Sequence, residues 1–140
     1  MDTYLHELAD RLVSFDTVST KTNVEAMEYL GSHLESHGFT TALHRTDVAG
    51  VPKVDLVAYA GPPEPDGLII SGHVDIVPFS GQPGWQRDPL HLDITEDRVY
   101  GRGVSDMKGF LAQCVDAAAQ LDVKALRRPL VFIFTSDEEI

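Results

Sequence analysis

Apolar residues recur along this chain at two different spacings, and the spacing changes from segment to segment. In residues 5–13 and 24–34 they fall three or four positions apart, which is the period of a helix with one buried face. Residues 39–45 and 53–60 have the alternation and the β-branched residues of strands, and the Gly- and Pro-containing segment 47–52 between them favours a turn. The N-terminal part is therefore predicted to form two helices followed by two strands.

The rest of the chain continues to alternate between elements. Residues 68–77 are apolar on both faces, as in a strand of a sheet that helices cover on each side. Residues 91–100 favour a short hairpin, a single apolar stripe predicts a helix from Ser105 onward, and residues 127–136 predict a last buried strand. This order predicts an α/β fold, layered helix-sheet-helix around a mostly parallel mixed sheet.

Composition limits the class of protein. A chain of 140 residues with 43% apolar and 24% charged residues is typical of one globular domain, residues 1–140. A net charge of −11 opposes binding to nucleic acid and to anionic membrane surfaces. Residues 1–15 do not resemble a signal peptide, and the single cysteine, Cys114, is predicted to be a core residue of a protein in a reducing compartment. The cytoplasm is the expected location.

His73 and Asp75 form the first candidate site, near the end of the strand predicted at 68–77. Residues two apart on a strand point to the same face, and open α/β sheets bind ligands at the carboxyl ends of their strands. A histidine that binds a metal usually donates its other N–H to a carboxylate, which Asp75 offers. A hydrogen-bonded pair without a metal is the alternative for this site alone.

Asp106 lies in the second candidate site, at the start of the helix predicted from Ser105. Its carboxylate there would stabilise the helix dipole, with Ser105 as the cap. Gly101 and Gly103 permit a tight backbone path and favour an anion-binding turn, but Asp106 occupies the place where a phosphate would bind.

Three consecutive acids, Asp137, Glu138 and Glu139, follow the last predicted strand and form the third candidate site. Ser136 followed three residues later by Glu139 also fits a capping box for a helix beginning after Ile140. We predict that the acids contribute to a metal site, because the ends of parallel strands gather along one edge of a sheet.

Together the three sites offer one imidazole and several carboxylates. Mixed nitrogen and oxygen ligands suit zinc or cobalt better than magnesium or calcium. Two metals about 3.5–4 Å apart can share a bridging carboxylate, activate water and polarise a carbonyl. The combination predicts a metal-dependent hydrolase.

The motifs SGHVD (71–75), GRGVSDMKG (101–109) and TSDEE (135–139), in this order, resemble the dinuclear zinc amidohydrolase and metallopeptidase superfamily. That superfamily includes acetylornithine deacetylase, succinyl-diaminopimelate desuccinylase, aminoacylase and glutamate carboxypeptidase. Residues 12–19 and 77–89 also look like the acetylornithine deacetylase branch. The resemblance implies a zinc-peptidase-like catalytic domain.

The resemblance also implies a role for each candidate residue. His73 looks like a ligand of one metal, and Asp75 looks like the carboxylate that orients it. Asp106 looks like the carboxylate that bridges both metals, and in the family it precedes a cis peptide bond. Glu138 looks like the general base that takes a proton from water, and Glu139 looks like a ligand of the second metal.

The activity implied is hydrolysis of a small-molecule N-acyl amino acid, with N-acetylornithine giving ornithine and acetate on the route to arginine. Two metals with about three protein ligands each need about six metal–ligand bonds. This chain offers four of them, from His73, from Glu139 and, counted twice as a bridge, from Asp106. About two ligands therefore have to be supplied from elsewhere. The family supplies them as a downstream carboxylate and histidine. We therefore expect an N-terminal portion of the catalytic domain, without the lid and dimerisation domain of a homodimeric enzyme, and inactive alone.

Other functions remain open from the sequence. A sibling with another acyl specificity is the nearest alternative, and a magnesium-binding phosphoacceptor receiver domain or a non-catalytic fragment are alternatives of other classes. A receiver domain makes no use of a histidine beside Asp75. The remaining histidines are predicted to be surface or packing residues: His6, His33, His37, His44 and His91. Trp85 is predicted to anchor its loop in the core, with a place in a substrate pocket as the alternative.

Overall fold

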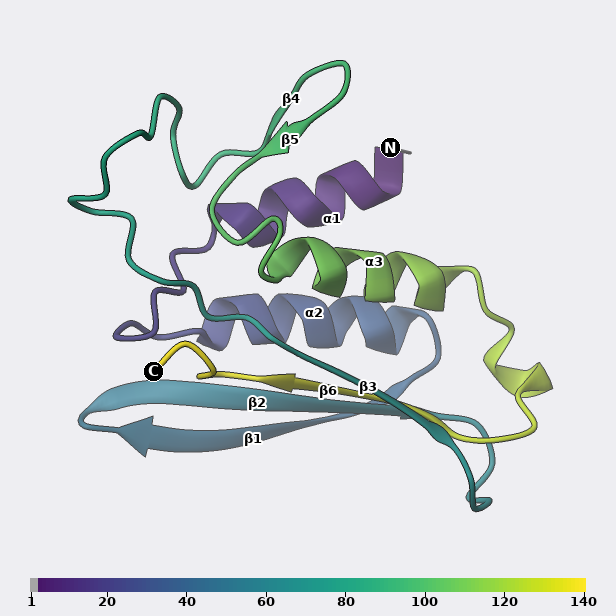
Figure 1. Ribbon diagram of the computed structural model, residues 1–140. Helices are drawn as coiled ribbons and strands as arrows, with labels where there is room; N and C mark the ends of the chain where they lie inside the picture. Colours follow the sequence, from purple (N-terminus) through teal and green to yellow (C-terminus); the bar gives the residue numbers. More distant parts are fainter. Residues whose placement is uncertain (1–2) are drawn as a thin grey trace.

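In the computed structural model, which describes residues 3–140, three helices lie on one side of a four-stranded sheet, and a two-stranded hairpin lies apart from it (Figure 1). The elements in chain order are α1 (Thr3–Ser14), α2 (Val24–Ser36), β1 (Thr40–Val48), β2 (Val51–Ala60), β3 (Leu68–His73), β4 (Asp93–Ile94), β5 (Val99–Tyr100), α3 (Lys108–Ala119), the short 3-10 helix η1 (Val123–Ala125) and β6 (Leu130–Thr135). None of the helices in residues 3–140 is long and apolar enough to cross a bilayer.

The large sheet has the strand order β1-β2-β6-β3. β1 pairs with β2 and β2 with β6 in antiparallel fashion, whereas β3 and β6 are parallel, with His73 opposite Thr135. The mixed α/β class is confirmed, although only one of the three pairings is parallel, fewer than predicted. This one parallel pairing matters for function, because it brings the carboxyl ends of β3 and β6 to the same edge.

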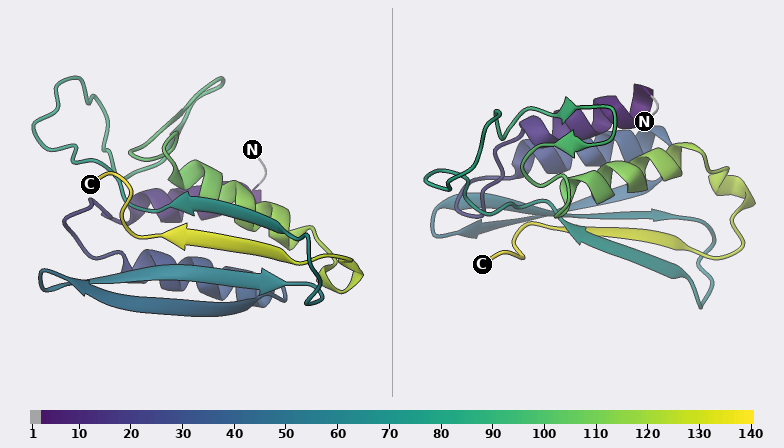
Figure 2. Two further views of the ribbon diagram at one scale, coloured as in Figure 1. Left: turned by 60° about the horizontal axis from the view of Figure 1, so that its bottom comes forward. Right: turned by 45° about the horizontal axis from the view of Figure 1, so that its top comes forward.

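All three helices lie on one face of the sheet, so the layering differs from the predicted helix-sheet-helix order (Figure 2). β3 is an edge strand, and its residues Leu68 and Ile69 are 58% and 63% exposed. The apolar residues on both faces of β3 indicated that both faces would be covered. Such a pattern indicates a tendency to burial, but it does not specify which element supplies the cover.

The core lies between the helices and the covered face of the sheet. Phe132 and Phe134 alternate along β6 and point to this face, with ring centroids 5.7 Å apart. Leu56 of β2, Leu12 of α1 and Leu111 of α3 are fully buried in the same cluster. The strand and helix periods predicted from the sequence are both satisfied by this one layer of side chains.

Helix α3 begins three residues later than predicted. Its N-cap is Met107, which makes no side-chain capping bond, and Lys108 is the first helical residue. The peptide bond between Asp106 and Met107 is cis, as the family resemblance implied. Ser105 is therefore not the cap, and Asp106 belongs to the turn before the helix.

Cys114 lies on the buried face of α3, as predicted. Burial raises the pKa of its thiol to about 11. A reactive cysteine needs a pKa below its ordinary value, because the thiolate is the nucleophile. Cys114 is therefore a packing residue.

Two helical glycines give a matched test of the turn that carries Asp106. A Cβ added at Gly109 of α3 would lie 2.2 Å from the Val104 carbonyl oxygen, whereas at Gly31 of α2 its nearest neighbour would be Leu56 Cδ1 at 3.6 Å. We expect Gly109→Ala to lower the free energy of unfolding by about 1–3 kcal/mol, because backbone must move. Gly31→Ala should raise it by up to about 1 kcal/mol. Urea denaturation measures both, and equal effects would contradict the close approach at Gly109.

Candidate metal centre

His73 is the last residue of β3, and its buried ring is held by Asp75. Nδ1 lies 3.1 Å from Asp75 Oδ1 and 3.1 Å from the Asp75 carbonyl oxygen. Both are acceptors, so Nδ1 carries the proton and donates it. In the neutral ring this leaves the lone pair on Nε2, the atom that can bind a metal.

Nε2 of His73 faces a group of carboxylates from two other segments. Asp106 Oδ1 lies 3.0 Å away and Glu138 Oε2 lies 3.9 Å away. Three possible ligand atoms, one from each of His73, Glu138 and Glu139, all lie within 4.8 Å of one another. The structure thus brings together residues that are far apart in the chain, and an imidazole with several carboxylates is a donor set that fits zinc.

The charges of the cluster act on its histidine. Burial lowers the pKa of His73, but the hydrogen bond to Asp106 and the charge of Asp75 outweigh burial, so the pKa is raised overall. The pKa of Glu139 is raised too, first by burial and then by the charge of Asp106. The carboxylates that crowd this edge therefore favour a cation among them.

Asp75 is fully buried and accepts hydrogen bonds from three segments of the chain. Its Oδ1 accepts from the Glu138 N–H at 3.0 Å as well as from His73. Its Oδ2 accepts from the Ser19 hydroxyl at 2.6 Å and from the Glu139 N–H at 3.1 Å. The Glu139 N–H thus binds Asp75 and not the Ser136 hydroxyl, so the capping-box alternative is not formed here.

Asp137 does not join the other two acids of its motif. Its carboxylate lies 2.6 Å from the Nζ of Lys53, a buried residue of β2. The prediction that all three consecutive acids belong to the metal cluster is wrong for Asp137. The chain bends at residues 136 and 138, after the last strand has ended, so the Asp137 side chain faces Lys53 while the Glu138 side chain lies beside His73.

Sequence reasoning missed the polar residues that surround the cluster. They are Ser19, Lys53 and Asp55, and the last accepts a hydrogen bond from the Ser136 N–H at 2.7 Å. Lys53 and Asp55 are two apart on β2 and so share a face, which was the one available signal. Nothing local indicates that this face would meet residues more than 80 positions later.

A cavity of ≈ 340 Å³ opens beside the cluster. Its lining contains His73 and two of the carboxylates, with small residues from β3 that leave room. The lining residues are Ser71, Gly72, His73, Asp106, Met107, Thr135 and Glu138. A cavity of this size admits water and the reacting end of a small substrate.

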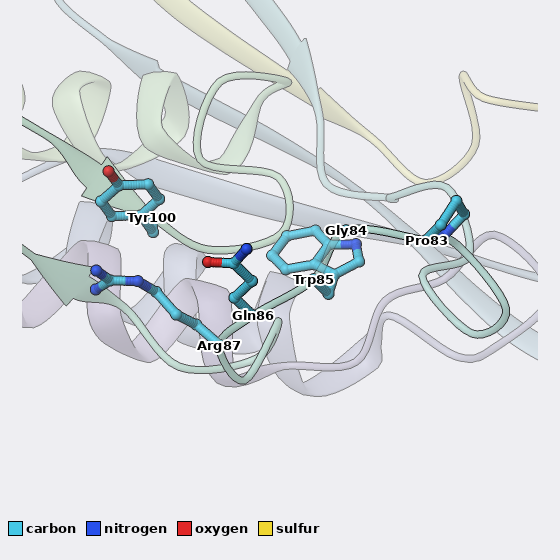
Figure 3. A pocket seen from close by; sticks show the side chains of 6 residues that line it. All are labelled: Pro83, Gly84, Trp85, Gln86, Arg87 and Tyr100. Carbon is cyan, nitrogen blue, oxygen red and sulfur yellow. The ribbon is translucent and has the colours of Figure 1, made fainter.

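A separate cavity of ≈ 380 Å³ lies along the loop that precedes β4 (Figure 3). Its lining residues are Pro83, Gly84, Trp85, Gln86, Arg87 and Tyr100, none of which is an acid or a histidine. Trp85 is exposed and lies against the Arg102 guanidinium, 4.8 Å from the ring centroid, so the prediction that it anchors its loop in the core is wrong. This cavity lacks metal-binding side chains.

Three of the remaining histidines have partners outside the group of carboxylates around His73. His33 and His37 of the α2 region bond to the Tyr4 hydroxyl at 3.0 and 2.8 Å. His91 lies near Asp10 at 3.8 Å and is largely exposed. These placements agree with the predicted surface and packing roles.

A sequence model of the peptidase family M20/M25/M40 matches residues 69–140. This stretch is slightly more than half of the 140-residue chain. It contains His73, Asp75, Asp106 and the two glutamates of the cluster. The match therefore coincides with the residues that the structure brings together.

Individual relatives agree with the family match. The chain is 39% identical over 126 residues to an acetylornithine deacetylase of Pasteurella multocida, covering 90% of this chain and 32% of that protein. It is 39% identical over 132 residues to an acetylornithine deacetylase of Myxococcus xanthus, covering 92% and 33%. The chain thus spans about a third of the length of these relatives.

Solved structures share the fold. An M20 family metallo-carboxypeptidase of Sulfolobus solfataricus superposes with a TM-score of 0.80 at 28% identity, over 99% of this chain and 32% of that one. The dipeptidase Dug1p of Saccharomyces cerevisiae superposes with a TM-score of 0.79 at 20% identity, over 96% and 32%. By its sequence match, and in agreement with this fold, the chain belongs to the peptidase family M20/M25/M40.

Proposed function

We propose that this chain provides the metal-binding part of a zinc-dependent hydrolase that cleaves N-acyl amides. The observation that carries the proposal is the convergence of His73 Nε2 with carboxylates of Asp106, Glu138 and Glu139 beside one cavity. The family match gives no support to the alternative from another class, a magnesium-binding receiver domain.

Within this class we propose N-acetylornithine as the substrate, with ornithine and acetate as products on the route to arginine. The support is the name of the relatives from Pasteurella multocida and Myxococcus xanthus, at 39% identity. Those proteins extend well beyond the matched segment, so their substrate is a proposal for this chain. Desuccinylase, aminoacylase and dipeptidase activities are the alternatives within the same family.

The proposed ligands are His73 for one metal, Glu139 for the second, and Asp106 between the two. Asp75 acts behind His73, because its buried carboxylate accepts the Nδ1 proton and thereby directs Nε2 toward the cavity. Zinc bound here would act as a Lewis acid and would lower the pKa of water toward about 7. Cobalt fits the same donors.

Glu138 is proposed as the general base. Its side chain is 63% exposed, so water can reach it, and its Oε2 lies 3.9 Å from His73 Nε2 at the mouth of the cavity. Its backbone N–H is fixed on Asp75, so the side chain projects from a held position. From there Glu138 can accept a proton from attacking water and return it to the departing amine.

We further propose that residues 1–140 form the N-terminal portion of a longer catalytic domain. Two metals with about three protein ligands each need about two more ligands than this chain offers. A further carboxylate, a histidine and a lid and dimerisation domain would then lie in the remaining two thirds of a relative-sized protein. A cytoplasmic homodimer is part of this proposal, and the lone Cys114 agrees with a reducing compartment.

The test is an assay of the complete gene product on N-acetylornithine, N-succinyl-diaminopimelate and a dipeptide, with and without a zinc chelator. We expect chelator-sensitive cleavage of N-acetylornithine in preference to the other two, and no appreciable cleavage by residues 1–140 alone. Glu138→Ala should lower kcat by about 10²–10⁴-fold, the usual contribution of a general base.

The outcomes separate the class from the substrate. Activity that survives complete removal of metal would contradict a metal-dependent hydrolase. Chelator-sensitive activity with a preference for the succinyl compound or the dipeptide would keep the class and replace the substrate.

A further inference from the structure

We infer that Lys53 is a positioning residue for the proposed metal site: with Ser19 it holds the segment 136–139 in the conformation that turns Glu138 and Glu139 toward His73. The expected effect on zinc binding rests on the proposed function. The support of the segment 136–139 by Lys53 rests on hydrogen bonds within residues 3–140. Neither Lys53 nor Ser19 is among the residues that line the cavity. Both act through other residues.

The environment of Lys53 is unusual for a lysine. The residue is 2% exposed, although it lies on β2 near a turn. Its Nζ donates to Asp137 Oδ1 at 2.6 Å and to the Ser19 carbonyl oxygen at 2.6 Å. A buried ammonium group is tolerated only where it is paired and hydrogen-bonded, so this contact constrains both partners.

Ser19 connects Lys53 to the residue that orients the histidine. Its carbonyl oxygen accepts from Lys53, and its hydroxyl donates to Asp75 Oδ2 at 2.6 Å. Its backbone N–H donates to the Ile76 carbonyl oxygen at 3.2 Å, which fixes the loop after α1 beside the chain that continues from β3. Lys53, Ser19 and Asp75 therefore form one continuous hydrogen-bonded connection.

The segment 136–139 needs such support because the strand ladder ends before it. The β3–β6 pairing stops at His73 and Thr135. Beyond it, side chains take over: the Ser136 N–H donates to Asp55, and the Glu138 and Glu139 N–H groups donate to Asp75. Between these contacts, Lys53 binds the Asp137 carboxylate.

The directions of neighbouring side chains in this segment explain the consequence. Asp137 points to Lys53, whereas Glu138 lines the cavity beside His73. Releasing Asp137 lets the segment rotate, and the mutual repulsion of Glu138, Glu139 and Asp106 favours rotation away from His73. The Lys53–Asp137 contact opposes that repulsion from outside the metal cluster.

The experiment compares Lys53→Met and Asp137→Asn with a matched control, Lys21→Met. Lys21 also pairs with an aspartate, Asp16, but its side chain is exposed and this ion pair does not include a residue of the segment 136–139. In zinc-free protein, amide hydrogen exchange is followed at Glu138 and Glu139, with Val57 of β2 as the internal reference. In parallel, the zinc dissociation constant is measured by calorimetry with a competing chelator.

We expect Lys53→Met to speed exchange at Glu138 and Glu139 at least about tenfold while exchange at Val57 changes less than about twofold. Zinc affinity should fall about 10–100-fold, the usual effect of removing support from behind a ligand. Asp137→Asn should act in the same direction, and Lys21→Met should change neither quantity. If Lys53→Met does not fold, Asp137→Asn tests the same contact from its more exposed partner.

Unchanged exchange at Glu138 and Glu139 in a folded Lys53→Met or Asp137→Asn protein overturns the inference. Faster exchange with unchanged zinc affinity also overturns it, because the contact would then be structural only. If the unmodified chain binds no zinc, the proposed metal site fails, whereas the hydrogen-exchange result still decides whether Lys53 holds the segment. The two failures are thereby distinguishable.

Discussion

Replacing Asp75 with alanine is expected to lower the free energy of unfolding by about 3–5 kcal/mol, a large effect for one residue. Asp75 is 0% exposed and accepts hydrogen bonds from a side-chain hydroxyl, an imidazole and two backbone N–H groups. Removing the acceptor leaves these donors buried without partners, and each unsatisfied donor costs about 1–3 kcal/mol. Urea denaturation followed by circular dichroism measures the change.

Two variants make the Asp75 result specific. Asp75→Asn keeps the shape but presents an NH₂ group to donors on one side, so it should also destabilise the protein, by less than alanine. Asp97→Ala removes a carboxylate whose side chain is 78% exposed and should change stability by no more than about 0.5 kcal/mol. A loss below about 1 kcal/mol for Asp75→Ala would show that these hydrogen bonds do not hold the three segments together.

Replacing His73 with alanine is expected to weaken zinc binding by at least about 100-fold. His73 is the one nitrogen donor in a cluster whose other members are carboxylates, and zinc prefers imidazole to an additional carboxylate. The ring is also pre-oriented by Asp75, so its loss removes a ligand already held in place. Calorimetric titration of zinc into residues 1–140 measures the change, and weak binding is expected for the unmodified chain.

His91→Ala is the matched control for His73→Ala. His91 also lies near a carboxylate, with Nδ1 3.8 Å from Asp10 Oδ1, but it is largely exposed and apart from the cluster. Its removal should leave the zinc dissociation constant within about twofold. Equal zinc binding by the two variants would contradict the assignment of His73 as a ligand, and a preference of the unmodified chain for magnesium would contradict zinc.

Much of the fold could be predicted because burial imposes a local period on the sequence. The helical spacing of Leu8 and Leu12, and the alternation of Phe132 and Phe134, locate α1 and β6 from the sequence alone. The pairing of strands is only partly local. The turn predicted at 47–52 is too short for a crossover, so it makes β1 and β2 antiparallel neighbours. Alternation alone does not specify that β6 lies between β2 and β3, or in which direction it pairs with each, so these pairings are set by tertiary contacts.

The beginning of α3 shows where local rules fail. Ser105 and Asp106 have the side chains of a helix start, but the structure uses them in a turn with a cis peptide bond and starts the helix at Lys108. The turn also requires a glycine at position 109, because a Cβ there would lie 2.2 Å from the Val104 carbonyl oxygen. Capping preferences predict a helix start where no tertiary contact constrains the backbone, whereas the turn before α3 is constrained by its surroundings.

The candidate site was only partly accessible to sequence reasoning. The convergence of His73, Asp106 and Glu139 follows from strand ends and motif order. The support behind it does not, because Lys53 and Asp137 are 84 positions apart and each has an ordinary local context. Long-range polar contacts leave no periodic trace in a single sequence, so only the structure shows them.

The most direct test of the metal site is a crystal of this chain grown with zinc and measured at the zinc absorption edge. We predict an anomalous peak in the cavity beside His73, about 2.0–2.2 Å from its Nε2 and from a carboxylate oxygen of Asp106 or Glu139. Anomalous peaks found only elsewhere, for example beside His33 and His37, would contradict the account.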